Sequence, residues 1–486
     1  MKINYKLCAT SLVSILTLTT VQAATTSEPL GGQVALGSKP SVTNLDEQVA
    51  YQRAFEAVIW AMPASAIYRF RVGALDVPGM ADNVVIANPG PLTQTTELIT
   101  ANTVTPYISL FSDLRKGPLV LELPAKTDKA SLYGQIVDAW QLTLADVGPS
   151  GLDKGEGAKY IIVPPNYDKA IPEGYTAIKS PSYRIGMAFR SVPAPSASNE
   201  DAYAYSKTLK VYPLADAATP PETKFVNVID LPMRTLPFYD IRALQDIKDI
   251  IDVEPVRPQD KVMIGMLATI GIERDKPFNP EGKLKTAMER GVKDAYFYIR
   301  QQADKMHEAN LYWPDGHWSL AMYPDENQGF EYVTNDAVQI DKRAAVWSYF
   351  TWYPQKMSNQ VGVVYLAPTA DKNGRPLQAG KNYRLHVPAD VPARQFWSLT
   401  LYDHATRAFI INPQKRNGLG SKEKDSLKMN ADGSVDLYFG PKPPKGFENN
   451  WLPTMGKKPY LWFRLYAPAE AFWDKSFKLP DVELVK

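Results

Sequence analysis

The period of the hydrophobic pattern changes twice along this chain, and each change marks a different kind of core. Over residues 84–229, apolar side chains come in short runs separated by Pro and Gly, which is typical of strands. Over residues 239–310 they recur about every 3.6 residues, as in amphipathic helices, and from residue 323 the short runs return. The sequence therefore predicts a multi-domain, mainly β protein with a helical domain between two strand-rich domains.

The first strand-rich domain is predicted to be an antiparallel β-sandwich over residues 84–235. Its clearest strand candidates are residues 118–123 and 159–163, and one helical insert is expected at residues 200–209. Strands that follow one another without crossover helices pair antiparallel, as they do in sandwiches. A second sandwich or jelly roll is predicted over residues 323–486, where strand candidates such as 409–411 dominate.

The helical domain is predicted over residues 236–322. A long apolar stripe runs from Leu284 to Met306, and the shorter segments 241–251 and 259–268 are expected to cover it.

The N-terminal segment, residues 25–83, contributes one more helix. A capping box at Asn44 and Glu47 predicts a helix over residues 45–62, and Pro63 is expected to weaken or kink it there. We expect this helix to return and join the helical domain.

Residues 1–24 have the layout of a secretory signal peptide. Lys2 and Lys6 precede an apolar run, and small residues stand where a signal peptidase cleaves. The predicted location is periplasmic or secreted, with no transmembrane segment after signal removal, because no later run approaches the roughly 20 apolar residues that a span needs. A buried N-terminal helix and a retained membrane anchor are the alternatives.

Cysteine content and charge exclude several classes of function. The only cysteine, Cys8, lies inside the predicted signal, so the exported chain would have no thiol for disulfides, thiolate metal sites or nucleophilic catalysis. The 54 Lys and Arg nearly balance the 52 Asp and Glu, which removes the electrostatic argument for a nucleic-acid partner. The expected partner is a small-molecule or polymeric ligand.

Short catalytic motifs with a known mechanism are missing from the sequence. There is no nucleophile elbow and no zinc-binding H-E-x-x-H helix, and the glycine-rich stretch 148–157 lacks the Gly-Lys-Ser/Thr of a phosphate-binding loop. The stretch is therefore interpreted as a sandwich loop. The cofactor and the metal content both stay open.

One loop offers candidate catalytic residues. Asp315 and His317 lie in a short Pro/Gly turn between two tryptophans, where a carboxylate could orient the imidazole as a general base or share a metal site with it. The alternative is that His317 is simply packed or faces solvent, because histidines in loops often have no chemical role.

Two sets of motifs resemble a known pairing of domains. Asn102–Tyr107 and Asp138–Trp140 resemble the bacterial domain of unknown function DUF1254. Phe396–Asp403 and Arg464–Pro468 resemble DUF1214, its usual C-terminal companion. The resemblance implies an N-terminal immunoglobulin-like β-sandwich, a helical middle and a C-terminal jelly-roll β-sandwich. It implies no settled reaction.

The chain departs from these patterns at two places. Many members have an acidic residue in the Asn-x-Asp-Thr stretch, where this chain has Val104. The usual Arg-Tyr pair of the second pattern is Arg416-Asn417 here. If the acid serves a site in those members, this chain lacks it or uses other groups.

The DUF1214-like motifs also supply candidate ligand-binding residues, namely Asn412, Arg416, Asn450, Trp451 and Arg464. A guanidinium among Asn, Trp and Tyr side chains can fork onto a carboxylate or another anion. The alternative is structural: Arg464 pairs internally with Asp436 or Asp403, and residues 450–453 anchor a turn.

These observations leave three hypotheses for the function. The first is a hydrolase-like periplasmic enzyme that acts on a small or polymeric ligand in a cleft between domains. The second is a noncatalytic ligand-binding or envelope-interaction protein, which needs aromatic and hydrogen-bonding contacts but no pair of titratable groups. The third is a metal-dependent enzyme that uses the rare histidines.

Overall fold

The computed structural model describes residues 38–194, 196–325, 329–350 and 362–485. The chain divides into two units, Met1–Leu45 and Asp46–Lys486, and all contacts below lie within the second. The predicted signal, residues 1–24, lies outside the described residues. None of the described helices combines the length and the apolar character that a membrane span requires.

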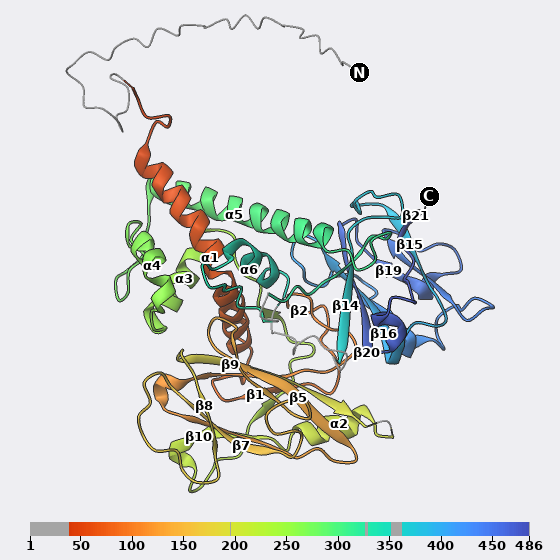
Figure 1. Cartoon of the computed structure of the whole chain (residues 1–486), viewed down its shortest axis with the longest axis horizontal. Coiled ribbons are helices and arrows are strands. Elements are labelled where there is room, and N and C mark those ends of the chain that lie inside the picture. The colour runs from red at the N-terminus through yellow and green to blue at the C-terminus, as the bar shows by residue number, and fades with distance from the viewer. Residues whose placement is uncertain (1–37, 195, 326–328, 351–361, 486) are drawn as a thin grey trace, which may run out of the picture. The chain divides into compact units, whose positions relative to one another are not determined.

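The predicted architecture, multi-domain and mainly β with a helical region, is confirmed (Figure 1). Buried apolar side chains form three clusters. One lies in each sandwich, and the largest joins the helices to the sheet faces that pack on them.

Two sheets form the first sandwich, with strand orders β11-β1-β3-β9-β5-β6 and β10-β4-β7-β8. The strands are β1 (Val85–Ala87), β3 (Ile108–Asp113), β4 (Leu119–Leu123), β5 (Ala130–Val137), β6 (Thr143–Val147), β7 (Ala158–Val163), β8 (Thr176–Lys179), β9 (Arg184–Pro193), β10 (Lys210–Pro213) and β11 (Phe225–Val226). Leu110 of the first sheet and Ile162 of the second belong to one buried cluster, so the two sheets share a core. The expected helical insert is α2 (Asn199–Ser206), which Ser198 and Asp201 cap reciprocally.

Within the described residues, the helical region contains five helices. Two other described helices lie outside it, α2 and a short α7 (Glu470–Trp473). The five are α1 (Leu45–Leu75), α3 (Ile241–Val253), α4 (Lys261–Ala268), α5 (Gly282–Ala309) and α6 (Ile340–Trp347). Side chains of all five belong to one apolar cluster or pack against it, so α1 does join the other helices. Phe55 of α1 packs on Tyr298 of α5 with ring centroids 5.4 Å apart.

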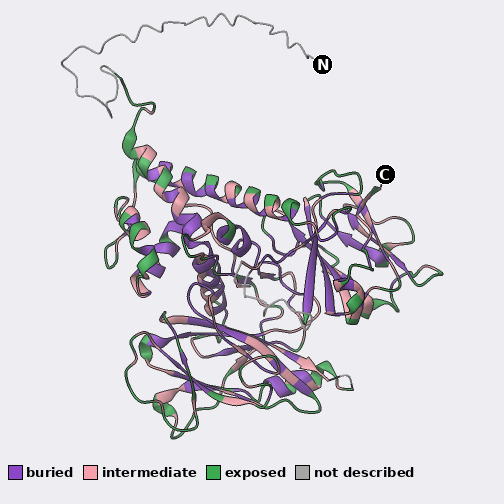
Figure 2. Ribbon diagram, viewed as in Figure 1, coloured by how far each residue is buried: buried purple, intermediate pink, exposed green. Residues whose placement is uncertain are grey.

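Two predictions about helices are wrong. The helix expected to weaken near Met62 continues through Pro63 to Leu75, because the turns that follow Pro63 are buried and their packing outweighs the lost backbone hydrogen bond. Helix α6 lies in a region where strands were expected. Its Ala344, Val346 and Trp347 are buried in the helical cluster, as the burial colours show for much of this region (Figure 2).

The second sandwich has sheets ordered β13-β14-β20-β16-β17 and β19-β18-β15-β21. Its strands are β13 (Trp318–Leu320), β14 (Val363–Pro368), β15 (Asn382–Val387), β16 (Ala393–Asp403), β17 (Gly418–Gly420), β18 (Val435–Gly440), β19 (Trp451–Pro453), β20 (Pro459–Pro468) and β21 (Glu483–Val485). A small pair, β2 (Thr96–Glu97) and β12 (Met233–Arg234), stands apart. The predicted strand at 409–411 is reduced to one isolated bridge, Tyr402 to Phe409.

Candidate functional site

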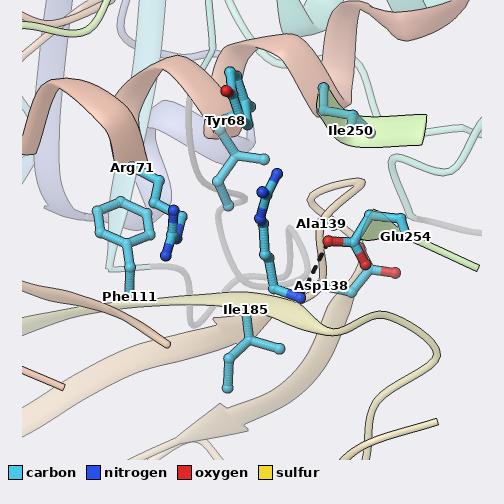
Figure 3. A pocket seen from close by; sticks show the side chains of 10 residues that line it. Tyr68, Arg71, Phe111, Asp138, Ala139, Ile185, Ile250 and Glu254 are labelled. Carbon is cyan, nitrogen blue, oxygen red and sulfur yellow. Dashed lines mark hydrogen bonds between the residues drawn. The ribbon is translucent and has the colours of Figure 1, made fainter. Parts of the chain in front are cut away.

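A pocket lies where α1 and the end of α3 pack on the first sandwich (Figure 3). Its cavity volume is about 20 Å³, within about 300 Å³ of free space that includes open solvent. The lining residues are Ile67, Tyr68 and Arg71 from α1, Phe111, Asp138, Ala139, Arg184 and Ile185 from the sandwich, and Ile250 and Glu254 from the α3 region. Apolar walls with a few converging polar groups are typical of small-molecule sites.

Asp138 directly follows β5 and is completely buried. Its Oδ1 accepts hydrogen bonds from the backbone N–H groups of Trp140 and Leu142, both at 2.8 Å. Its Oδ2 is buried and has no hydrogen-bond partner among the described residues. Burial raises the pKa of Asp138 to about 6, because the backbone N–H groups only partly offset the loss of solvation. One oxygen of this carboxyl therefore stays available for a ligand or a proton.

Glu254 is the C-cap residue of α3 and holds the start of β9 in place. Its carboxylate accepts hydrogen bonds from the backbone N–H groups of Tyr183, at 2.8 Å, and of Arg184, at 3.2 Å, the second of which is dashed in Figure 3. Burial raises the pKa of Glu254 to about 7, and the charge of Asp138 adds to the rise. Two carboxyl groups that can change protonation near neutral pH thus line one pocket.

Two arginines contribute positive charge to the same pocket. Arg71 forms an ion pair with Asp82 at 2.6 Å, whereas the guanidinium of Arg184 donates, among the described residues, to the backbone carbonyl of Asp249 at 3.4 Å. The Nε atoms of both arginines are buried and have no hydrogen-bond partner within the described part of the chain. Burial lowers the pKa of Arg184, and the charge of Arg71 lowers it further. The pocket therefore offers unused donors beside an unused carboxyl oxygen.

Tyr68 completes the polar lining. Its hydroxyl donates to Asp249 Oδ2 at 2.8 Å, and burial together with this bond raises the pKa of the phenol. The guanidinium of Arg184 lies 5.4 Å from the centre of its ring. Tyr68 thus stays protonated at neutral pH and orients Arg184 across the pocket.

One residue of this pocket, Asp138, stands out in the sequence, although the sequence alone gives it no role. Asp138 belongs to the motif Asp138–Trp140 and follows a strand directly, a position where a functional carboxylate often lies. Glu254, Arg71 and Arg184 carry no such signal, because they meet Asp138 only through the packing of α1 and α3 on the sandwich.

The candidate catalytic residues Asp315 and His317 do not contact each other. Asp315 is exposed and forms an ion pair with Lys478 at 2.7 Å. His317 Nδ1 lies 2.9 Å from Asp481 Oδ2, and its backbone N–H donates to the other oxygen of Asp481 at 2.8 Å. The expected orienting role of Asp315 is therefore wrong: the carboxylate that orients the imidazole is Asp481. Neither candidate lines the pocket.

Two of the four histidines, His307 and His404, pack against the same ring, that of Tyr460, but each has its own hydrogen-bond partners. His386 pairs with Asp436 and His404 with Asp304, whereas His307 is buried among the hydroxyls of Ser319, Tyr323 and Tyr460. Within the described ranges, no group of three or more His, Cys, Asp or Glu side chains could hold a metal ion.

Four of the five predicted ligand-binding residues hold backbone in the second sandwich. Arg416 Nη1 donates to the carbonyls of Glu448, Asn449 and Trp451, the closest at 2.8 Å. Asn412 donates to the carbonyls of Ile410 and Arg416. Asn450 bonds the backbone of Lys428 in both directions, and Trp451 Nε1 donates to the Gly440 carbonyl. Their polar groups stabilise loops, which agrees with the structural alternative for this segment.

Arg464 differs from these four, because its buried guanidinium bonds side chains as well as backbone. It is 1% exposed and donates to Thr400 Oγ1 and Tyr402 Oη, each at 2.6 Å, and to the Thr100 carbonyl at 3.2 Å. The expected ion pair with Asp436 or Asp403 is wrong. Asp403 pairs instead with Lys457, at 2.6 Å.

Two protein-family models match separate segments of the chain. The family model described as "Protein of unknown function (DUF1254)" matches residues 83–213, and that described as "Protein of unknown function (DUF1214)" matches residues 362–470. The chain pairs a DUF1254 domain with a DUF1214 domain. Asp138 and Arg184 of the pocket therefore lie in the DUF1254 domain, whereas Arg71 and Glu254 lie outside both matched segments.

A solved structure resembles this DUF1254–DUF1214 protein in fold. The VPA0106 protein from Vibrio parahaemolyticus aligns over 91% of this chain and 100% of its own, with 17% identity and a TM-score of 0.52. An uncharacterized protein from Burkholderia cenocepacia aligns over 91% of this chain and 96% of its own, with 12% identity and a TM-score of 0.37, which is too low to support an argument. No curated protein matches the chain. The first similarity shows the fold alone.

Proposed function

We propose that the protein is a hydrolase-like enzyme that performs acid–base chemistry on a small ligand in the pocket between α1, α3 and the first sandwich. The observation that carries the proposal is the pair of buried carboxyl groups, Asp138 and Glu254, whose pKa values burial raises to about 6 and about 7. Side chains that titrate near the working pH are the effective general acids and bases. Carboxyl groups shifted in this way inside a pocket are typical of active sites.

The residues would have different roles. Asp138 is the candidate proton-transfer group, because its Oδ2 is free while its Oδ1 is fixed by two backbone N–H groups. The charge of Asp138 raises the pKa of Glu254, so Glu254 would hold its proton while Asp138 is ionised. Arg71 and Arg184 would bind an anionic group of the substrate through their unused donors. The limited volume favours a small anionic substrate over a polymer.

A second candidate function is binding without turnover in the same pocket. It is favoured by Glu254, whose two oxygens each accept a backbone hydrogen bond and so have a structural role already. A binding protein needs the two arginines and the apolar wall, but it needs no proton transfer by Asp138.

The experiment compares Asp138→Asn with Asp315→Asn in the full chain. Wild-type protein is assayed on a panel of small anionic esters, amides and glycosides, and ligands retained on purification are identified by mass spectrometry. On any substrate that is turned over, D138N should lower kcat by about 100-fold or more, the usual effect of losing a general acid or base. D315N, which removes an exposed carboxylate, should leave kcat unchanged. Equal rates in D138N and wild type would overturn the proposed role.

Binding measurements separate the two candidate functions. If the protein only binds, a retained ligand should bind D138N and wild type with similar affinity and should be recovered chemically unchanged from both. Arg184→Gln should lower the affinity for that ligand whether the protein is an enzyme or only binds.

We also propose that the protein is exported, which is supported by the charged, apolar and small-residue order of residues 1–24. The test is the N-terminal sequence of protein recovered from the periplasm or medium. An intact Met1 on protein found only in the cytoplasm would overturn this proposal.

A further inference from the structure

Strand β20 presents two chemically different faces. Leu461, Phe463 and Leu465 point into the core of the second sandwich. On the alternate positions, Tyr460, Trp462 and Tyr466 belong to the cluster that packs on the helices, and Arg464 stands between them in the sequence. Because side chains alternate along a strand, Arg464 shares this aromatic face of the sheet.

A second arginine reaches the same face from the first sandwich. Arg190, on β9, donates from Nη2 to Tyr107 Oη at 2.7 Å and to Tyr365 Oη at 3.2 Å. Tyr365 lies on β14, the neighbour of β20, and the centre of its ring is 5.3 Å from the guanidinium carbon of Arg464. Tyr365 is therefore in contact with both cations.

The partners of these two arginines are all neutral. Arg190 donates to phenols, and Arg464 donates to a threonine, a tyrosine and a backbone carbonyl. Across the described residues, neither guanidinium forms an ion pair with Asp or Glu. A buried charge is normally balanced by an opposite charge, because removal from water is costly. Two cations near one phenol without a carboxylate therefore leave negative charge missing.

Hydrogen-bonding capacity is also unused at this place. Arg464 Nε is buried and has no partner within the described part of the chain, and the same is true of Ser398 Oγ. Ser398 lies directly opposite Arg464 in the pairing of β16 with β20, so the two free donors are close on one sheet. Buried donors without acceptors are uncommon and often mark a site for a ligand or an ion.

Tyr365 responds to the excess positive charge. Burial by itself would raise the pKa of its phenol, but Arg190 and Arg464 outweigh burial and lower the pKa. The electrostatic potential at this hydroxyl is thus positive enough to favour an anion.

We propose that Arg190, Arg464 and Ser398 form a second binding site, which takes the carboxylate group of a small organic acid. A carboxylate supplies the missing charge and accepts from guanidinium forks. The aromatic surroundings favour a monoanion over a phosphate dianion, because removing a doubly charged group from water costs more. This site is independent of the pocket at Asp138 and does not rest on its chemistry.

The test uses the full chain and sodium acetate as the probe. Acetate is titrated by calorimetry at constant ionic strength, with chloride and phosphate as the comparison anions. Wild type should bind acetate more tightly than chloride or phosphate. Arg190→Gln should weaken acetate binding by about tenfold or more, which corresponds to the loss of one charged contact. Arg375→Gln, which removes an exposed guanidinium paired with Asp371, should leave acetate binding unchanged.

Two further variants keep the proposal testable if loss of an arginine harms folding. Ser398→Ala removes one free donor and should weaken acetate binding by about threefold to tenfold without removing charge. Tyr365→Phe tests the main rival explanation, in which Tyr365 itself ionises and balances the arginines. An ultraviolet phenolate signal at neutral pH that Y365F abolishes, together with no binding of acetate, would overturn the proposal. Equal acetate affinity in wild type and R190Q would also overturn it, as would binding of phosphate or chloride but not acetate.

Discussion

Asn102 donates a hydrogen bond from Nδ2 to the phenol oxygen of Tyr466, at 2.9 Å and across 364 positions of the sequence. Asn102 belongs to a DUF1254 motif and Tyr466 to a DUF1214 motif. The Oδ1 of the same asparagine accepts from the backbone N–H of Val104 at 2.7 Å. The motif segments of the two domains therefore meet in the folded protein at one buried junction.

This junction should contribute measurably to stability. Tyr466→Phe is expected to lower the free energy of unfolding by about 1 kcal/mol, because a buried hydrogen bond is lost while the ring remains. Chemical denaturation of Y466F, Asn102→Ala and the double variant gives the coupling energy of the pair. Tyr203→Phe, on α2, is the matched control and should change little. Additive effects of the two substitutions would show that the contact contributes nothing.

Asp138 should make stability depend on pH in a defined direction. Its pKa rises from 3.8 to about 6 on folding, so the folded state binds this proton more tightly than the unfolded state. The resulting stabilisation is complete below pH 3.8 and is lost as the pH rises through about 6. The loss amounts to roughly 3 kcal/mol at most, at 1.36 kcal/mol per pKa unit.

Asp138→Asn isolates this effect, because the other titrating groups remain. Denaturant unfolding of wild type and D138N across this pH range should show a shallower decline for the variant. The asparagine oxygen can still accept from the N–H groups of Trp140 and Leu142. Parallel curves for the two proteins would show that Asp138 is not the buried acid described above.

His317 should not take part in turnover if the pocket at Asp138 is the active site. His317→Ala removes a partly exposed pair with Asp481, so the expected loss of stability is about 1 kcal/mol. Its kcat should stay within about twofold of wild type, whereas D138N should be strongly impaired. If H317A is inactive but unfolds at the same temperature as wild type, the His317–Asp481 pair takes part in catalysis and the pocket at Asp138 is not the active site.

Gly148 should be intolerant of any side chain. Its φ is +91°, and a Cβ would lie 1.9 Å from the carbonyl oxygen of Leu132. Gly174 has a similar φ of +84° but open space around it. Gly174→Ala is therefore expected to cost about 1 kcal/mol from backbone strain alone, and Gly148→Ala about 2 kcal/mol more. If Gly148→Ala and Gly174→Ala lower the free energy of unfolding equally, measured by thermal and chemical unfolding, then the structure relieves the close approach at Gly148 at no cost.

The glycine-rich stretch illustrates what local sequence can predict. It was interpreted as a sandwich loop, and Asp153 does close it by accepting from the Gly148 N–H at 2.6 Å. The helix α5 was likewise predictable, since an apolar stripe at helical spacing requires a partner. Pro63 shows the opposite: local preference weakens a helix there, and burial of the following turns maintains it.

The amino-acid sequence by itself determined most of the strands and helices and which family domains they build, because hydrophobic period and turn residues act over a few positions. Only the tertiary structure decided which polar groups work together. Asp138 and Glu254 line one pocket, and Arg190 and Arg464 both contact Tyr365, through packing between segments distant in the chain. Their protonation and charge balance depend on burial and neighbours, and spacing along a sequence carries neither quantity.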